Sequence, residues 1–191
     1  MISHKHKFIF LHIPKSGGIS LNSALAVNTT IDERFKGGHP KLSRYHEMCN
    51  IDDYFKFTFT RNPWDRLLSC YKYLKSGGRN NCKHDIDAGK ELKDIEFSDF
   101  VRNITNYNFI HIKPQMFFIE HINSLDFIGR FENLQGDFNK VCDKIGLERR
   151  QLPHKNKSIH KHYTEYYNDE TKQIVAERYA KDIECFGYTF N

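Results

Sequence analysis

The sequence predicts a three-layer α/β fold with a central, mainly parallel sheet flanked by helices. Short apolar runs that suit buried strands alternate with longer segments of helical periodicity. The first run, FIFLHI at 8–13, leads directly into Pro-Lys-Ser-Gly-Gly at 14–18. A strand, a glycine-rich loop and a helix in this order outline a phosphate-binding loop. The predicted architecture is therefore P-loop-like.

Four segments in the first part of the chain can be assigned in order. The run 8–13 is short, apolar and bounded by Pro14, which predicts a buried strand, and 19–26 predicts the helix after it. Residues 27–50 give no clear pattern. FKFTFT at 55–60 alternates as a strand does, and Asn62-Pro63 then supplies a helix cap and a first helical residue. This helix is expected to end at Gly77-Gly78.

The second part of the chain continues the alternation. A polar surface loop is expected over 78–94, and DFIGRF predicts a third strand over 126–131. Helices are expected over 97–104, over 113–121, from Asn133 to Gly146, and from Asn168 or Asp169 to about Ala180, with a basic loop over 149–163.

The length fits one domain, 1–191, and the composition is ordinary for a soluble protein. The net charge of +5 suits anionic ligands but is too small to argue for nucleic acid. Five Cys without a CxxC pair give neither a disulfide framework nor an expected metal site. Cys70 and Cys142 lie in helical apolar patterns and are expected in the core.

The amino-terminal segment is basic and then apolar, as in a signal peptide. Its apolar run has only six residues and is followed by Pro-Lys instead of a cleavage site. No run approaches the roughly 18 apolar residues of a membrane span. We therefore expect a cytoplasmic protein without a transmembrane segment, at most attached peripherally to a membrane.

The loop 14–18 is the first candidate anion site. In a strand–loop–helix unit, backbone N–H groups of a glycine-rich loop converge on one anion, and the helix dipole adds positive charge. Lys15 adds a full charge, while Ser16 and Ser20 add hydroxyl donors. The alternative is a plain turn with Lys15 in solvent.

Arg61 is the second candidate cation. It follows the strand 55–60, and Ser69 lies two turns into the next helix. Ligands of parallel α/β sheets bind at the carboxyl ends of strands, so Arg61 and Lys15 are expected at one edge. Arg61 can donate two hydrogen bonds to a phosphate. The alternative is an Arg that caps a helix or forms a salt bridge.

Two motifs resemble signatures of the carbohydrate (membrane-type, family 2) sulfotransferases: HIPKSGGISL, and FTFTRNPWDRLLSCYKYL at 57–74. GRFENLQGDFNKVCDKIGL at 129–147 and the carboxyl-terminal segment also resemble this family. The resemblance implies a P-loop-like fold and the sulfuryl donor 3′-phosphoadenosine 5′-phosphosulfate (PAPS), without a metal. The first loop would hold the 5′-phosphosulfate, with Lys15 on the leaving oxygens: Pro14, Lys15, Ser16, Gly17, Gly18, Ile19 and Ser20.

The same resemblance assigns the other end of the donor. Arg61 and Ser69 would hold the 3′-phosphate, and the loop LPHKNKS at 152–158 would add Lys155 and Asn156. The missing Gly-Lys-Ser/Thr pattern is then understandable, because there is no pair of β- and γ-phosphates with Mg²⁺ to hold.

A catalytic base is needed for the acceptor hydroxyl, and His39 is the first choice. Uronyl 2-O-sulfotransferases, within the same family, have a catalytic His between the two signatures at similar spacing. An unperturbed His also titrates near neutrality. His46 and Glu47 remain alternatives, and His12 is expected to support the loop from the sheet.

These observations predict a sulfotransferase that acts on a hydroxyl group, expected on a saccharide. Two other readings stay open. A P-loop nucleotide kinase is disfavoured by the lack of Gly before Lys15 and of an evident Mg²⁺-binding Asp. A non-catalytic polyanion-binding module is disfavoured because both cation sites, Lys15 and Arg61, are present.

Overall fold

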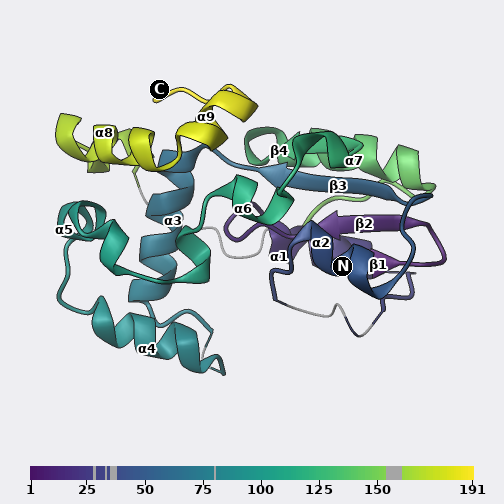
Figure 1. Ribbon diagram of the computed structural model, residues 1–191, viewed down its shortest axis with the longest axis horizontal. Helices are drawn as coiled ribbons and strands as arrows, with labels where there is room; N and C mark the ends of the chain where they lie inside the picture. Colours follow the sequence, from purple (N-terminus) through teal and green to yellow (C-terminus); the bar gives the residue numbers. More distant parts are fainter. Residues whose placement is uncertain (28, 33, 35–37, 80, 154–160) are drawn as a thin grey trace. The chain divides into compact units, whose positions relative to one another are not determined.

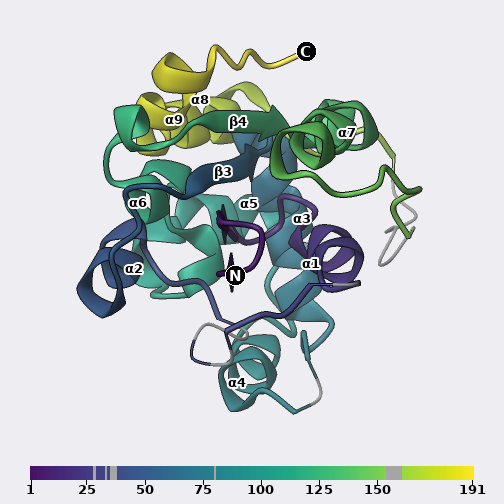
Figure 2. The ribbon, with the colours of Figure 1, turned by 90° about the vertical axis from the view of Figure 1, so that its right-hand side faces the viewer.

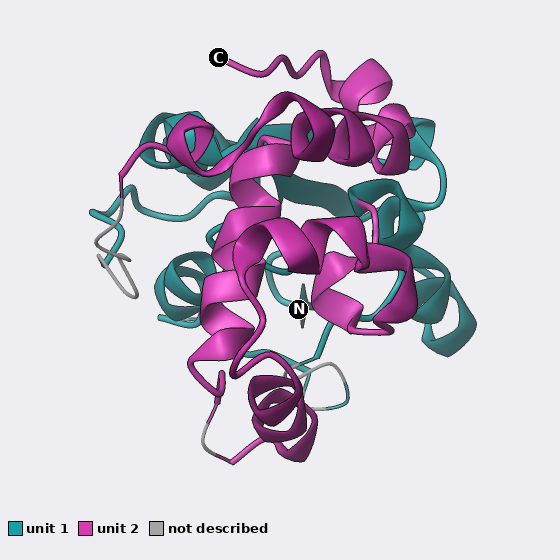
Figure 3. Ribbon diagram, turned by 90° about the vertical axis from the view of Figure 1, so that its left-hand side faces the viewer, with its two compact units in different colours: residues 1–61, 115–157 teal, residues 62–114, 158–191 magenta. Residues whose placement is uncertain are grey.

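The computed structural model of the chain describes residues 1–27, 29–32, 34, 38–79, 81–153 and 161–191. The chain forms two compact units, shown in different colours in Figure 3. Unit 1 consists of residues 1–61 and 115–157, and unit 2 of residues 62–114 and 158–191. The α/β fold class predicted from the sequence is confirmed by unit 1, which contains the sheet (Figure 1).

The sheet has four strands in the order β1-β2-β3-β4: β1 (Ile2–Ser3), β2 (Phe8–Leu11), β3 (Phe55–Thr60) and β4 (Phe127–Arg130). β2, β3 and β4 are parallel neighbours, and β1 pairs with β2 in the antiparallel direction. All four residues of β2 are buried, as expected for a strand that is covered on both faces. The three parallel strands therefore end at one edge of the sheet.

Helices cover both faces of this sheet. Figure 2 shows α1 (Gly18–Leu25) and α7 (Leu134–Ile145) on one side of the strands, and α2 (Leu42–Met48) and α6 (Gln115–Ile119) on the other. The core under α1 and α7 is built from the strand phenylalanines and from apolar helix residues: Phe8, Phe10, Phe57, Phe59, Leu21, Leu25, Phe138, Val141 and Cys142. Alternation along β2 and β3 places these rings on one face.

Unit 2 consists of helices. They are α3 (Pro63–Lys75), α4 (Lys83–Glu91), α5 (Phe97–Arg102), α8 (Asp169–Arg178) and α9 (Ala180–Phe186). α3 begins as the sequence predicts: the Asn62 side chain accepts from the Trp64 N–H at 3.1 Å, and Pro63 is the first helical residue. Short 3₁₀ segments complete both units: Ile104–Asn106, Ile110–Ile112, Ile122–Ser124, Phe131–Asn133 and Tyr163–Tyr166.

Several predicted elements are confirmed. The strand 55–60 has the predicted bounds, and the helix after Asn133 ends at Gly146, which has a left-handed φ of 67°. Cys70 and Cys142 are buried, and all five Cys are free thiols. The strand predicted over 8–13 is shorter, since it ends at Leu11 before the loop begins.

The prediction of a surface loop over 78–94 is wrong, because α4 occupies most of this segment. The segment KHDIDAGKE has too few apolar residues to show a helical period. Its inward residues include Asp85, which accepts hydrogen bonds from the Tyr73 hydroxyl at 2.6 Å and the Arg79 N–H at 3.0 Å. A buried carboxylate with hydrogen-bond partners thus takes the inward position at which an apolar side chain would be expected.

β1, α2 and α9 were not predicted. β1 has only two residues, too few for an alternating pattern. The last helix ends at Arg178 instead of about Ala180, and α9 follows after Tyr179. Three of the seven residues of α9 are charged, and one of these, Asp182, is buried, so the apolar positions show no clear helical period.

Candidate active site

The loop between β2 and α1 forms the first part of the candidate site. Lys15 and Gly17, on either side of Ser16, both have left-handed φ angles, 67° and 82°. Left-handed residues next to right-handed ones turn successive backbone N–H groups toward one side, which is how anion-binding nests form. Gly17 caps α1, whose first turn contains no acidic residue. The amino terminus of α1 therefore presents N–H groups and positive dipole charge.

Gly18 has no room for a side chain. A Cβ atom there would lie 1.9 Å from Nε2 of His12. The His12 ring packs against the first residue of α1 and stacks on Phe10, with ring centroids 5.9 Å apart. His12 therefore supports the loop from the end of β2, as the sequence analysis expects.

Ser16 supplies an observation that points to a ligand. Its side chain is 1% exposed, and its hydroxyl has no hydrogen-bond partner among the residues that the structure describes. A buried hydroxyl without a partner costs free energy, on the order of 1–3 kcal/mol. An anionic oxygen in the loop would accept its hydrogen bond, so these residues fit a phosphate or sulfate group.

Arg61 is held rigidly at the carboxyl end of β3. Its guanidinium donates from Nη1 to the Lys15 carbonyl at 3.0 Å and lies 4.0 Å from the centre of the Phe131 ring. The Gln115 amide brackets the Arg61 backbone: Oε1 accepts from the Arg61 N–H at 2.9 Å, and Nε2 donates to the Arg61 carbonyl at 3.0 Å. The two cations predicted at strand ends are thus brought together in unit 1.

Phe131 and Gln115 are two further residues of the candidate site. Phe131 directly follows β4, which places it at the same strand edge as Arg61. The turn that presents it is fixed by Asp137, which accepts from the Arg130 N–H at 2.8 Å. The clamp of Gln115 on the Arg61 backbone has no local sequence signal, because the two residues are 54 positions apart.

His39 lies beside the loop on the side of His12. The two rings are 4.5 Å apart, and the His39 ring also faces Phe118 at 6.2 Å. His39 Nδ1 is 3.0 Å from the His12 carbonyl oxygen. Because a carbonyl only accepts, Nδ1 carries the hydrogen, and in the neutral ring Nε2 then holds the lone pair. This is the tautomer in which an imidazole can accept a proton at Nε2.

The alternative bases lie differently. His46 and Glu47 are exposed on α2, and the Glu47 carboxylate pairs with Arg44 at 3.0 Å. Of the three candidates, His39 is the one with a recorded contact to a residue of the loop region. Its role as a base stays a prediction.

The remaining predicted site residues are placed as follows. Pro14 and Ser20 are buried and Ile19 is half-buried, all in the loop and the first turn of α1. Ser69 lies in α3 of unit 2 and is partly exposed, so its partnership with Arg61 stays a prediction. Lys155 and Asn156 lie outside the described residues. Within the described part of the chain, no group of three or more His, Cys, Asp or Glu is arranged to hold a metal.

Comparison with known proteins identifies relatives of the whole chain. A model described as the sulfotransferase family matches residues 1–189. Carbohydrate sulfotransferase 10 of Xenopus laevis is 27% identical over 98% of this chain, and carbohydrate sulfotransferase 14 of Mus musculus is 24% identical over 98%. An uncharacterized protein of Archaeoglobus fulgidus is 32% identical over 51% of this chain. No solved structure matches significantly. The resemblance noted in the sequence is confirmed.

These relatives also correct the expected cytoplasmic location, which is wrong. The chain spans 66% of the length of the first relative and 59% of the second. The expectation took the lack of an anchor within 191 residues as a sign of the compartment, although a third or more of each relative lies outside the matched region. Among the helices that the structure describes, none is both long and apolar enough to span a bilayer.

The close approach at Gly18 gives a stability prediction. Gly18→Ala should lower the free energy of unfolding by about 1–3 kcal/mol, because the new methyl group overlaps the His12 ring. The penalty should shrink in a His12→Ala background, where the ring is absent. Urea denaturation of the four proteins measures it; equal penalties in both backgrounds would contradict the assigned contact.

The clamp on Arg61 gives a second prediction. Gln115→Ala leaves the Arg61 N–H and carbonyl without these partners and should cost roughly 2–4 kcal/mol of unfolding free energy. The exposed Gln151→Ala is the matched control for thermal or chemical denaturation. A Gln115→Ala protein as stable as that control would refute the clamp.

Proposed function

Because the chain belongs to the sulfotransferase family, we propose that it transfers a sulfuryl group from PAPS to a hydroxyl group of a saccharide. The observation that supports this most is the pairing of two anion-binding elements at one sheet edge. The loop carries an unpartnered buried hydroxyl on Ser16, and Arg61 bonds directly to the loop carbonyl of Lys15. The names of the relatives, carbohydrate sulfotransferases 10 and 14, support a saccharide acceptor.

The donor has two anionic groups on one ribose, so the groups that bind them must lie within the reach of one nucleotide. In this proposal the N–H groups of residues 15–20 and the Ser16 hydroxyl bind the 5′-phosphosulfate. Arg61 and Ser69 bind the 3′-phosphate, and Lys155 and Asn156 are proposed as further donor-binding residues. The direct contact between Arg61 and Lys15 supports this short spacing. The bound donor supplies an electrophilic sulfur with a phosphate leaving group.

Transfer is an in-line displacement in which positioning and charge stabilisation do most of the work. The acceptor oxygen forms a bond to sulfur as the bond from sulfur to the phosphate oxygen breaks. His39 takes the hydroxyl proton at Nε2, the nitrogen that holds the lone pair when Nδ1 donates to His12. Lys15 stabilises the negative charge that develops on the leaving phosphate.

A nucleotide kinase and a non-catalytic polyanion binder are the competing functions. A kinase needs the Gly-Lys-Ser/Thr loop that holds Mg²⁺ and the β/γ-phosphates, and here Ile13-Pro14 precede Lys15. A polyanion-binding module has no need for a histidine oriented by a backbone carbonyl beside the loop. The His39 geometry therefore favours the enzyme.

Nucleotide binding separates the first two functions. 3′-Phosphoadenosine 5′-phosphate should raise the melting temperature well above the shift produced by ATP with Mg²⁺. Arg61→Ala should remove most of this shift, because it deletes a charge-assisted contact worth about 1.5–3 kcal/mol. Thermal shift assays at matched ligand concentration measure it. A larger shift with ATP and Mg²⁺ would refute the sulfotransferase assignment.

Turnover separates an enzyme from a binder and tests the base. His39→Ala should retain nucleotide binding but lower kcat by about 10²–10⁴-fold, since proton acceptance is lost. Lys15→Ala should lower kcat by about 10²–10³-fold through loss of charge stabilisation. His46→Ala is the matched control and should stay active. Mass spectrometry of a glycan panel after incubation with PAPS reports transfer; full activity of the His39 variant would assign the base elsewhere.

A further inference from the structure

We propose that Glu120 is a positioning residue for His39, holding the segment 39–43 at the edge of the anion-binding loop. This inference rests on the proposed function and adds a residue to it. Glu120 follows α6, is remote in sequence from His39, and belongs to no motif of the sequence analysis. Its side chain joins the two helices on one face of the sheet, α2 and α6.

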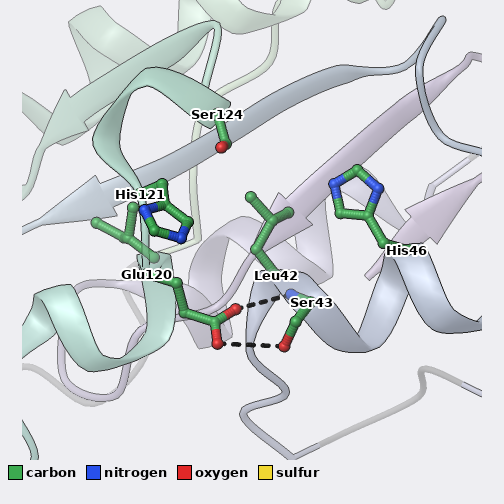
Figure 4. Close-up of a pocket in the computed structure, with 7 residues that line it drawn as sticks. Leu42, Ser43, His46, Glu120, His121 and Ser124 are labelled. Carbon is green, nitrogen blue, oxygen red and sulfur yellow. Dashed lines mark hydrogen bonds between the residues drawn. The ribbon is translucent and has the colours of Figure 1, made fainter.

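The contacts form a clasp, defined here as Glu120 with Lys41 and Ser43. The Glu120 carboxylate accepts from the Ser43 backbone N–H at 2.8 Å and from the Ser43 hydroxyl at 3.2 Å, as Figure 4 shows. It also pairs with the Lys41 ammonium at 3.4 Å. Ser43 is the second residue of α2, so the carboxylate satisfies an N–H that lacks an intrahelical partner and lies at the positive end of the dipole.

The charge of the clasp is favoured at neutral pH. Burial alone would raise the pKa of the Glu120 carboxyl, but the hydrogen bonds from Ser43 and Lys41 outweigh it, and the pKa is lowered. The Lys41 ammonium also lies 4.4 Å from the centre of the Phe117 ring in α6. Lys41 therefore contacts Glu120 through an ion pair and Phe117 of α6 through a cation–π interaction.

The clasp acts on His39 through a short, stiff connection. Only Pro40 separates His39 from Lys41, and its ring fixes one backbone dihedral and restricts His39 to extended conformations. His39 is anchored at its own ring by the His12 carbonyl, and the clasp anchors the chain two residues later. Two anchors on either side of Pro40 leave little freedom for the imidazole.

α6 connects this anchor to the anion site. Gln115 at its first position clamps the Arg61 backbone, Phe118 faces the His39 ring, and Glu120 follows its last residue. One short helix therefore sets both the cation that is proposed to bind the donor and the base that is proposed to act on the acceptor. All these residues belong to unit 1.

The backbone of Glu120 supports a specific role for this side chain. Its φ is 66°, in the left-handed region that Gly and Asn adopt readily and Glu does not. Residues held in such conformations concentrate at functional sites, because the surrounding structure must stabilise them. A Gly would adopt this φ without strain, whereas at Glu120 the contacts of the carboxylate offset the strain.

A pocket beside the clasp makes the variants testable. It has a volume of about 170 Å³ and is lined by Leu42, Ser43, His46, Ile119, Glu120, His121 and Ser124 (Figure 4). Without the Glu120 side chain, water entering from this pocket can satisfy the Ser43 N–H. Removal of the clasp is therefore compatible with folding.

Glu120→Gly is the decisive variant, because it removes the carboxylate and relieves the left-handed strain together. Its melting temperature should stay near that of the unaltered protein, while kcat falls by about 10–10²-fold through misplacement of the base. The KM for PAPS should change by less than about twofold, since the donor site is intact. Glu120→Gln should recover most of kcat, because its amide oxygen still accepts from the Ser43 N–H.

The matched control is Glu148→Ala, an exposed Glu of unit 1 with no recorded hydrogen bond, which should leave kcat unchanged. A readout independent of turnover is the ¹⁵N spectrum of the His39 imidazole in the full chain. The Nδ1–H tautomer should dominate in the unaltered protein and give way to a mixture in Glu120→Gly.

An unchanged His39 tautomer and unchanged kcat in Glu120→Gly would overturn the positioning role. A fall in kcat with an unchanged tautomer would overturn it too, because Glu120 would then act by another route. If the tautomer shifts but no variant or unaltered protein transfers a sulfuryl group, the positioning of His39 stands and the proposed function fails.

Discussion

The position of Arg61 is the constraint on which the candidate site depends. Its guanidinium bonds to the Lys15 carbonyl, its backbone is bracketed by Gln115, and its charge lies over the Phe131 ring. These partners come from the loop after β2, from α6 and from the end of β4. One side chain therefore ties the three parallel strand ends together, so that a buried cation and a glycine-rich loop meet at one edge.

Close contacts between residues and left-handed backbone conformations occur where the edge of the sheet meets the neighbouring helices. Gly18 makes room for the His12 ring, and Lys15, Gly17 and Glu120 have left-handed φ angles. The loop N–H groups face one side, and the Glu120 carboxylate reaches the first turn of α2. The buried strands β2 and β3 fix the backbone next to the loop, and such surroundings can stabilise residues in left-handed conformations.

The sequence predicted the sheet well, because FIFL and FKFTFT have the apolar and alternating patterns of buried strands. It predicted that Lys15 and Arg61 lie at one edge, because strand-end residues share one edge in a parallel sheet. It did not predict α4 or α9, whose inward positions include the acidic residues Asp85 and Asp182. The Gln115 clamp and the Glu120 clasp were also missed, since each joins residues more than 50 positions apart and no local pattern encodes such pairs.

The central claim is that the loop and Arg61 form one anion site that receives a 3′,5′-bisphosphorylated nucleotide. A crystal structure of the protein with 3′-phosphoadenosine 5′-phosphate tests it most directly. We predict the 5′-phosphate within hydrogen-bond distance of the N–H groups of residues 15–20 and the Ser16 hydroxyl, and the 3′-phosphate on Arg61. A nucleotide bound elsewhere, with the Ser16 hydroxyl still unpartnered, would contradict the account.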